Sequence, residues 1–202
     1  MKKLLMKIKP LFFGFFILFS CTGDDEMFTP KKYGHLRIDL TEENKNYTQI
    51  EKTCFMLLEI PDYAKIIKKN APDEHTCFMD VTIPKHKATI NITHKSIPSG
   101  DSMQLTAYLE HAHVFVHKHL IKADDYIDTL IFYPDKKVFA HVFNLTGDVA
   151  SPMQFVATDS VNHFVRGSLD FFVKPNYDSI LPVLNYIRED VYHMIKTIEW
   201  QN

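Results

Sequence analysis

A short apolar run that ends at a cysteine most constrains how this chain can fold. Four lysines precede the run at 11–19, and Ser20 and Cys21 follow it. The run is about half of the roughly 20 residues that a helix needs to span a bilayer. A positive flank and a short apolar run are typical of a signal peptide. Because a signal peptide is removed, we predict that residues 1–20 take no part in the fold.

Cys21 is the predicted lipid attachment site of the mature chain. A diacylglyceryl group on its thiol would hold the N-terminus on a membrane, and a second acyl signal would make that attachment durable. The alternative is an ordinary secreted protein in which the Cys21 thiol is free. Residues 21–32 are polar and acidic, with glycine and proline, which predicts a linker between the anchor and the fold.

The rest of the chain, 33–202, has the size of a single domain. Without the four lysines of the signal peptide, nineteen basic residues stand against 25 acidic ones, a net charge of −6. This balance argues against nucleic acid as a partner, because phosphate binding needs a basic surface. Cys54 and Cys77 are the remaining cysteines, and two cysteines in an exported protein favour a disulfide bond.

The first half of the domain reads as strands with one short helix. The polar stretch 43–49 predicts a loop, and Asp62 is a suitable N-cap for a helix at 63–69. Alternating or short apolar runs bounded by turn residues predict strands. These predicted strands are 36–40, 54–60, 77–83 and 88–95, of which the last three are expected to be antiparallel neighbours.

The second half predicts two long helices separated by strands. A helix capped by Asp101 or Ser102 is expected to run to Ala123, and another is expected over 179–200, with Pro182 tolerated in its first turn. Each helix carries one apolar stripe at helical spacing. Strands are predicted at 129–133, 138–145, 153–158 and 163–174. The fold class that follows is α+β, an antiparallel sheet with two long helices packed on it.

Histidines on the first long helix form a weak candidate metal site. His113 and His117 are four residues apart, which lets two imidazoles face one ion. No third ligand is clearly placed, and metal sites in proteins usually have three or four. We therefore expect no metal at this position.

Asp159, Ser160 and His163 contain the residue types of a hydrolase triad. The serine lacks a nucleophile-elbow context such as G-x-S-x-G. Between two strands, Asp159 and Ser160 are better explained as residues that satisfy turn backbone groups. We expect His163 and Arg166 to join a polar network at the end of the sheet.

Several motifs of the chain, taken together and in order, resemble the gliding-motility lipoprotein GldD family of Bacteroidetes. They lie at 34–40, 61–64, 84–90, 121–124, 149–152, 158–167, 178–183 and 187–190, with Trp200 near the end. The resemblance implies an envelope lipoprotein needed by the gliding machinery and by the linked type IX secretion system. It implies no known enzymatic activity and no assigned catalytic residues, and we expect no cofactor. The acidic cluster at 24–26 is similar to a surface-export signal of lipoproteins in this group, or is simply a solvated tether.

The function expected from these observations is a structural or assembly role. The expected partners are the membrane, through Cys21, and other proteins of the gliding and secretion machinery. One alternative is an envelope lipoprotein that binds a small ligand or peptidoglycan, which a pocket of aromatic and convergent polar groups would favour. Another is a hydrolase that uses Ser160 and His163.

Overall fold

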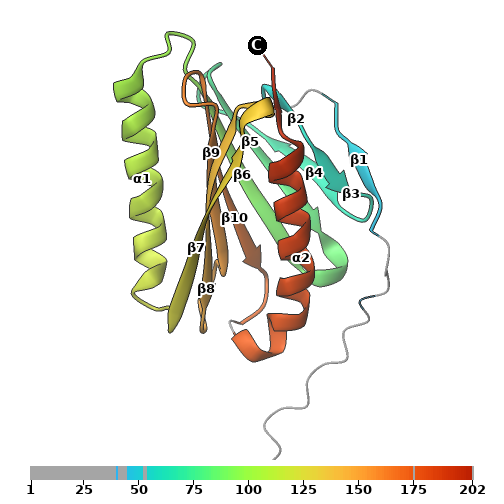
Figure 1. The fold of residues 1–202 in the computed structure, drawn as a ribbon. Coiled ribbons are helices and arrows are strands. Elements are labelled where there is room, and N and C mark those ends of the chain that lie inside the picture. The colour runs from blue at the N-terminus through green and yellow to red at the C-terminus, as the bar shows by residue number, and fades with distance from the viewer. Residues whose placement is uncertain (1–39, 41–44, 52–53, 175, 202) are drawn as a thin grey trace, which may run out of the picture. The chain divides into compact units, whose positions relative to one another are not determined.

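The computed structural model describes residues 40, 45–51, 54–174 and 176–201. The predicted signal peptide, Cys21, the linker and all but one residue of the predicted strand at 36–40 lie outside these residues. The described part has an α+β fold, as the sequence predicts: a large antiparallel sheet with two long helices (Figure 1).

The main sheet has seven strands, in the order β4-β5-β6-β10-β9-β8-β7, and every neighbouring pair is antiparallel. Its strands are β4 (Lys65–Lys69), β5 (Thr76–Ile83), β6 (Ala88–Ser96), β7 (Asp125–Tyr133), β8 (Val138–Thr146), β9 (Met153–Thr158) and β10 (His163–Phe171). Two small ladders lie outside it, β1 (Tyr47–Gln49) with β3 (Glu59–Pro61) and β11 (Glu199–Trp200) with β2 (Met56–Leu57).

Two hairpins of the sheet share one kind of turn. A single 3-10 turn, Pro84–His86, connects β5 to β6, and another, Pro134–Lys136, connects β7 to β8. Proline opens each turn because its ring already fixes the φ that the first position requires. The residue that closes each turn, Lys87 or Lys137, is left-handed, with φ of 49° and 52°. The matching turns place the two hairpins in the same local geometry.

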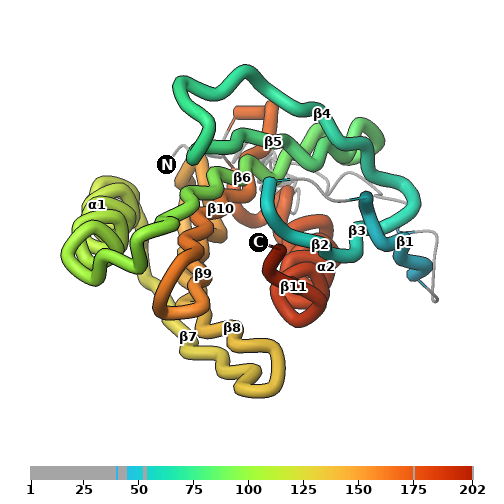
Figure 2. The backbone as a smooth tube through the Cα atoms, turned by 90° about the horizontal axis from the view of Figure 1, so that it is seen from above, coloured from blue at the N-terminus to red at the C-terminus, as the bar shows by residue number. Residues whose placement is uncertain are grey.

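The two long helices lie on opposite faces of the sheet, as the view from above shows (Figure 2). Helix α1 (Ser102–Leu120) begins at Asp101, whose carboxylate accepts the backbone N–H groups of Met103 and Gln104. Helix α2 (Tyr177–Thr197) begins at Asn176, which caps the N–H of Ser179. Both helices are predicted from their apolar stripes. The buried residues of α1 all fall on its predicted stripe, whereas in α2 three further buried residues, Val183, Asp190 and Met194, widen the stripe beyond the predicted residues.

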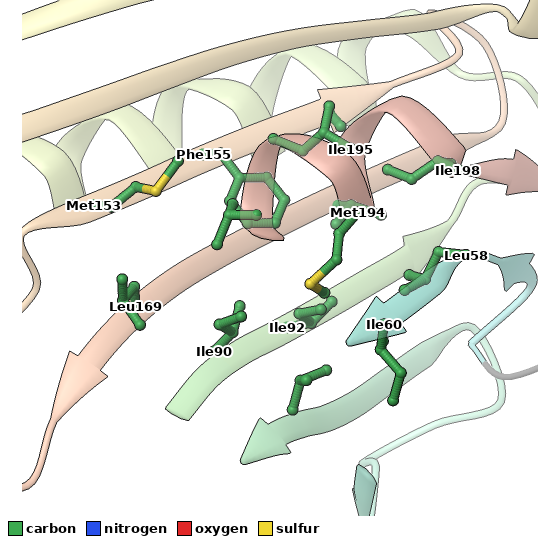
Figure 3. Packing of buried hydrophobic residues seen from close by; sticks show 14 of the residues in the cluster. Leu58, Ile60, Ile90, Ile92, Met153, Phe155, Leu169, Met194, Ile195 and Ile198 are labelled. Atoms are coloured by element: carbon green, nitrogen blue, oxygen red, sulfur yellow. The ribbon is translucent and has the colours of Figure 1, made fainter. Parts of the chain in front are cut away.

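The largest core lies between α2 and the sheet. Side chains of α2, β3, β6, β9 and β10 meet there, and the close view shows Met194 and Ile195 above the sheet residues Ile92 and Phe155 (Figure 3). Phe155 lies opposite Gly167 on the neighbouring strand. A Cβ at Gly167 would come within 2.1 Å of the Phe155 ring, so glycine is required to make room for the phenyl group.

The face under α1 carries two smaller clusters. One gathers Ile97, Leu105, Ala112, Val156 and Phe164, and the other gathers Val116, Phe143, Leu145 and Val149. Strand β9 is buried along its whole length, because α2 covers one of its faces and α1 lies over the other.

The predicted helix at 63–69 is wrong. Residues Lys65–Lys69 form β4, which pairs with β5 along its full length. The β-branched pair Ile66 and Ile67 favours a strand, and a five-residue segment is too short for periodicity to decide between the two forms. The predicted loop at 43–49 is also partly wrong, since its end forms β1.

The last helix ends earlier than predicted and begins sooner. It stops at Thr197, whose hydroxyl donates to backbone carbonyls one turn back and accepts the N–H of Glu59. The next residues leave the helix to pair with β2. Pro182 is the sixth helical residue, not a member of the first turn, so it removes one backbone hydrogen bond inside α2.

Candidate functional site

A disulfide bond joins Cys54 and Cys77, with their Cα atoms 5.2 Å apart. Cys77 lies in β5, but Cys54 lies in a left-handed turn before β2 and does not begin a strand. The predicted strand at 54–60 is divided into β2 and β3, and neither belongs to the main sheet. The bond therefore connects the small β2 ladder to the main sheet.

The residues of the hypothetical triad serve a turn. Asp159 Oδ1 accepts the backbone N–H groups of Val161, Asn162 and His163, at 2.9, 2.8 and 2.8 Å. The Ser160 N–H donates to Thr158 Oγ1 at 2.9 Å. No hydrogen bond in the described part of the chain connects the Ser160 hydroxyl with a histidine. The turn prediction for this segment agrees with these contacts.

His163 belongs to a buried pair of histidines. Its Nδ1 lies 3.1 Å from His94 Nε2, and its ring stacks on Trp200 with centroids 5.1 Å apart. Burial lowers the pKa of His94 to about 3, with the neighbouring His163 as a second cause, and burial also lowers the pKa of His163. Both imidazoles are therefore neutral at pH 7. The cross-strand neighbour of His94 in β5 is Cys77, so this pair lies close to the disulfide.

Arg166 does not join this pair, contrary to the expected network at the sheet end. It lies on the opposite face of β10, where its guanidinium is 4.1 Å from the ring centroid of Phe115 in α1. Burial lowers the pKa of Arg166, and Asp170 opposes that change. The contact helps to fix α1 on the sheet.

The helix histidines lie near further polar residues that sequence reasoning missed. The ring of His113 lies 5.6 Å from that of His141 in β8, and His141 Nε2 is 2.8 Å from Asp128 Oδ2. Burial lowers the pKa of His113, followed by the charges of His141 and His117. Within residues 45–51, 54–174 and 176–201, no group of three or more His, Cys, Asp or Glu side chains has the arrangement to hold a metal ion.

A buried carboxylate on α2 forms another polar cluster that the sequence reading missed. Asp190 has no solvent exposure, accepts the hydroxyl groups of Tyr47 (2.8 Å) and Tyr63, and lies 2.9 Å from Lys45 Nζ. Burial and the hydrogen bond to Asp190 raise the pKa of both tyrosines. The cluster fixes β1 and the end of β3 against α2. A signal was present, since an acidic residue sits within the apolar stripe beside Ile187.

A polar hollow of about 400 Å³ lies where β5 and β6 approach the start of α1. Asp73, His75, Thr76, Ser96, Pro98, Ser99, Gln104 and Tyr108 line it. Gln104 Nε2 donates to the Tyr108 hydroxyl at 3.0 Å, and Lys95 Nζ donates to Thr76 Oγ1 at 2.8 Å. The pKa of Asp73 is lowered, first by a hydrogen bond from Thr76. The hollow offers many hydrogen-bonding groups, together with the phenol ring of Tyr108 and the imidazole ring of His75.

Comparisons with known proteins give the family. A family model described as gliding motility lipoprotein GldD matches residues 25–200. This chain belongs to the GldD family. The resemblance seen in the sequence motifs is thereby confirmed, and with it a role in gliding motility. The matched range contains the turn at Asp159, the histidine pair and the Asp190 cluster, and it begins after Cys21.

Two other comparisons add little to the family assignment. No curated protein matches the chain. Among solved structures, the solution structure of cyanobacterial PsbP (CyanoP) from Synechocystis sp. PCC 6803 is similar, with 10% sequence identity and a TM-score of 0.37. That match covers 71% of this chain and 90% of the other.

Proposed function

We propose that this protein is a lipid-anchored, non-catalytic component of the gliding machinery and of the linked type IX secretion system. The observation that carries the proposal is the match to the GldD lipoprotein family over residues 25–200. The acidic balance of the domain and its single folded unit suit a protein that contacts other proteins.

The anchor assigned to this role is Cys21. It follows the apolar run at 11–19 and lies outside the described residues. None of the described helices has the length and apolar character needed to cross a bilayer. A lipidated N-terminal cysteine and the linker at 21–32 would place the folded domain next to a membrane.

The contacts of the hypothetical triad support a non-catalytic role. The Asp159 oxygen that would orient a histidine already accepts three backbone N–H groups. His163 faces His94 and Trp200, and Ser160 is exposed on a turn. A nucleophile needs a base within hydrogen-bond reach. Ser160 and His163 are not hydrogen-bonded to each other in the described part of the chain.

Deletion of the gene, with complementation, tests the proposed role. We expect the deletion strain to lose colony spreading and to export less protein by the type IX route. Wild-type, Ser160→Ala and His163→Gln proteins are then each expressed in that strain. We expect Ser160→Ala to restore both activities, because an exposed turn substitution usually changes stability little. We expect folded His163→Gln protein to restore them too. A folded, abundant and membrane-bound Ser160→Ala protein that restores neither would contradict the non-catalytic role.

Replacement of Cys21 tests the anchor separately. We expect Cys21→Ala protein to leave the membrane fraction or to remain unprocessed, because the thiol that carries the lipid is gone. Metabolic labelling with a palmitate analogue measures this directly. Equal labelling of the variant and the wild type would show that the lipid is elsewhere.

The polar hollow supports a second candidate, the binding of a hydroxylated ligand such as a peptidoglycan fragment. Asp73, Thr76, Gln104 and Tyr108 bring carboxylate, hydroxyl, amide and aromatic groups to one place. Titration of ¹⁵N-labelled protein with soluble muropeptides tests it, and we expect Gln104→Ala to remove any resulting shifts. Shifts that survive in Gln104→Ala, or that appear elsewhere, would exclude the hollow.

A further inference from the structure

Strand β7 (Asp125–Tyr133) is an open edge of the main sheet. It forms a nine-residue ladder with β8 on one side and ends the strand order on the other. Several large apolar side chains of β7 are exposed. The exposed fractions are 48% for Tyr126, 66% for Ile127, 60% for Leu130 and 58% for Phe132. A long, apolar edge strand is a site at which another chain can add a strand.

The ladder geometry shows which backbone groups of β7 point outward. The Leu145 N–H donates to the Pro152 carbonyl, so odd-numbered residues of β8 direct their backbone groups toward β9. In an antiparallel ladder the direction alternates from residue to residue. Even-numbered residues of β8 therefore face β7, and their partners in β7 are odd-numbered. The N–H and C=O groups of Asp128, Leu130 and Phe132 point away from the sheet.

The first outward donor of this edge is already bound. The Tyr126 N–H, which also points outward, is bound by the Asp125 carboxylate at 2.8 Å. The outward N–H donors that stay open in β7 are thus those of Asp128, Leu130 and Phe132, and the carbonyls of these residues point outward with them. Their side chains share one face of β7, on the side of α1. An added strand would find backbone groups and apolar side chains at the same three positions.

The opposite edge of the sheet is protected in a way that β7 is not. Strand β4 has five residues, and three of them are lysines: Lys65, Lys68 and Lys69. Lysines and short length are common means of preventing edge-to-edge association. Strand β7 is nearly twice as long and has no lysine. In the described part of the sheet, lysines and short length therefore protect the β4 edge and not the β7 edge.

The charges of β7 define the partner. Its two charged residues, Asp125 and Asp128, are both acidic, and Asp124 precedes them. Like charges brought close across a ladder destabilise it. A second copy of β7 is therefore a poor partner, whereas a strand with lysine or arginine is a good one. The contact with His141 Nε2 at 2.8 Å fixes the Asp128 carboxylate, which can then pair with a lysine or arginine of the added strand.

We propose that β7 binds an extended, basic segment of another envelope protein, which continues the sheet by strand addition. Main-chain hydrogen bonds at Asp128, Leu130 and Phe132 provide the register, and alternate apolar side chains of the segment cover Leu130 and Phe132. The inference rests on the proposed assembly role, for which it names the contact surface.

Two substitutions at one exposed residue test the edge. Leu130→Lys places a charge where the added strand packs, and Leu130→Pro also removes an outward N–H that β8 does not use. We expect either variant to abolish colony spreading while its abundance and melting temperature stay those of the wild type. If Leu130→Pro fails to fold, Leu130→Lys decides the test, because a side chain that is 60% exposed tolerates lysine.

Matched controls distinguish an effect at the β7 edge from the effect of replacing any exposed apolar side chain by lysine. Met103→Lys changes an 80% exposed residue on α1, and Ile67→Lys changes a 51% exposed residue on β4. Both are expected to spread normally. If Leu130→Lys spreads as well as these controls do, the edge inference is wrong. If the deletion strain itself spreads normally, the proposed function fails first, so the two failures are distinguishable.

Photocrosslinking in cells identifies the occupant. Benzoylphenylalanine in place of Leu130 is expected to give an adduct with a different protein, and the same group at Met103 is expected to give none. An adduct of twice the mass of the protein would mean a second copy and would overturn the proposal. An adduct with lipid alone, or no adduct at Leu130, would overturn it too.

Discussion

The two faces of the main sheet are built differently. The face under α2 holds one continuous core, together with the disulfide, the histidine pair and the buried Asp190. The face under α1 holds two small clusters, and the strand beyond them, β7, is largely exposed. The contrast is visible in the side chains of the helices. Helix α2 buries seven residues, and α1 buries three, although their lengths are similar.

This difference separates the part of the domain that stabilises the fold from the part that is free to contact another protein. The α2 face buries enough apolar surface to determine whether the domain folds, because each large side chain removed from water contributes about 1.5–3 kcal/mol. The α1 face adds less to the core and leaves β7 open. The proposed assembly role needs both a stable core and an open contact surface, and here the core lies under α2 and the open surface is the edge strand β7.

The largest expected effect is on the α2 face. Leu184 is fully buried in the core, and we expect Leu184→Ala to lower the free energy of unfolding by about 3–5 kcal/mol, through lost burial and the cavity left behind. Leu109, which is partly buried under α1, is the matched control. Leu109→Ala should cost about half as much or less. Urea unfolding of both variants measures the difference, and equal losses would break the comparison.

The disulfide should have the next largest effect. Cys54 and Cys77 are 23 residues apart in the sequence, and closing a loop of that length contributes about 3 kcal/mol to stability in the chain-entropy model. We expect the double variant Cys54→Ser and Cys77→Ser to lose that amount in urea unfolding at pH 7. Mass spectrometry of non-reduced peptides from the cell envelope checks that the bond forms there. Two freely alkylated thiols in that sample would show that the bond is absent in the cell.

The sequence was sufficient for the elements with strong periodicity. The stripes of both long helices, the strands at 77–83 and 88–95, and the strands at 138–145 and 153–158 were all predicted, because each carries a repeated apolar pattern. The predictions for the short segments were wrong or partly wrong. Strand β4 forms because it pairs with β5, and β1 forms because it pairs with β3. Neither pairing can be inferred from the seven residues of the segment alone.

Long-range contacts explain why the candidate sites were only partly predictable. The Asp159–Ser160 turn was predicted because its hydrogen bonds are local. The pair of His94 and His163 brings together residues 69 positions apart, and only the register of β6 with β10 makes them neighbours. The Asp190 cluster likewise depends on the packing of β1 and α2, although an acidic residue on an apolar stripe marked the position.

The pH dependence of the free energy of unfolding should distinguish the buried His94 on the α2 face from exposed histidines. His94 has a pKa of about 3 in the fold, whereas an unfolded imidazole has a pKa near 6.5. Below about pH 6.5 the unfolded chain binds a proton that the folded chain does not, so stability is present above that pH and is lost as the pH falls toward 3. We expect a loss of about 2 kcal/mol from His94 between pH 7 and pH 5.

The variant His94→Gln measures the His94 contribution. Glutamine keeps a hydrogen bond to His163 but does not titrate. The free energy of unfolding of the variant should therefore change less between pH 7 and pH 5 than that of wild type. His75→Gln, at an exposed position, should keep the wild-type dependence. If His94→Gln loses as much stability on acidification as wild type, the acid sensitivity comes from another group.

The smallest expected effect is at the histidines of the α1 face. His113 is partly exposed and touches His141 and Phe143, so His113→Gln should change the free energy of unfolding by about 0.5 kcal/mol. His117→Gln, at an exposed position, should change it less. Zinc ions should then raise the melting temperature of wild type no more than that of His113→Gln, because two imidazoles are too few for a stable site. The experiment is a melting series with and without zinc. A rise in wild type that His113→Gln abolishes would mean that this face is stabilised by a ligand, and the contrast between a stable α2 face and an open α1 face would then hold only for the metal-free protein.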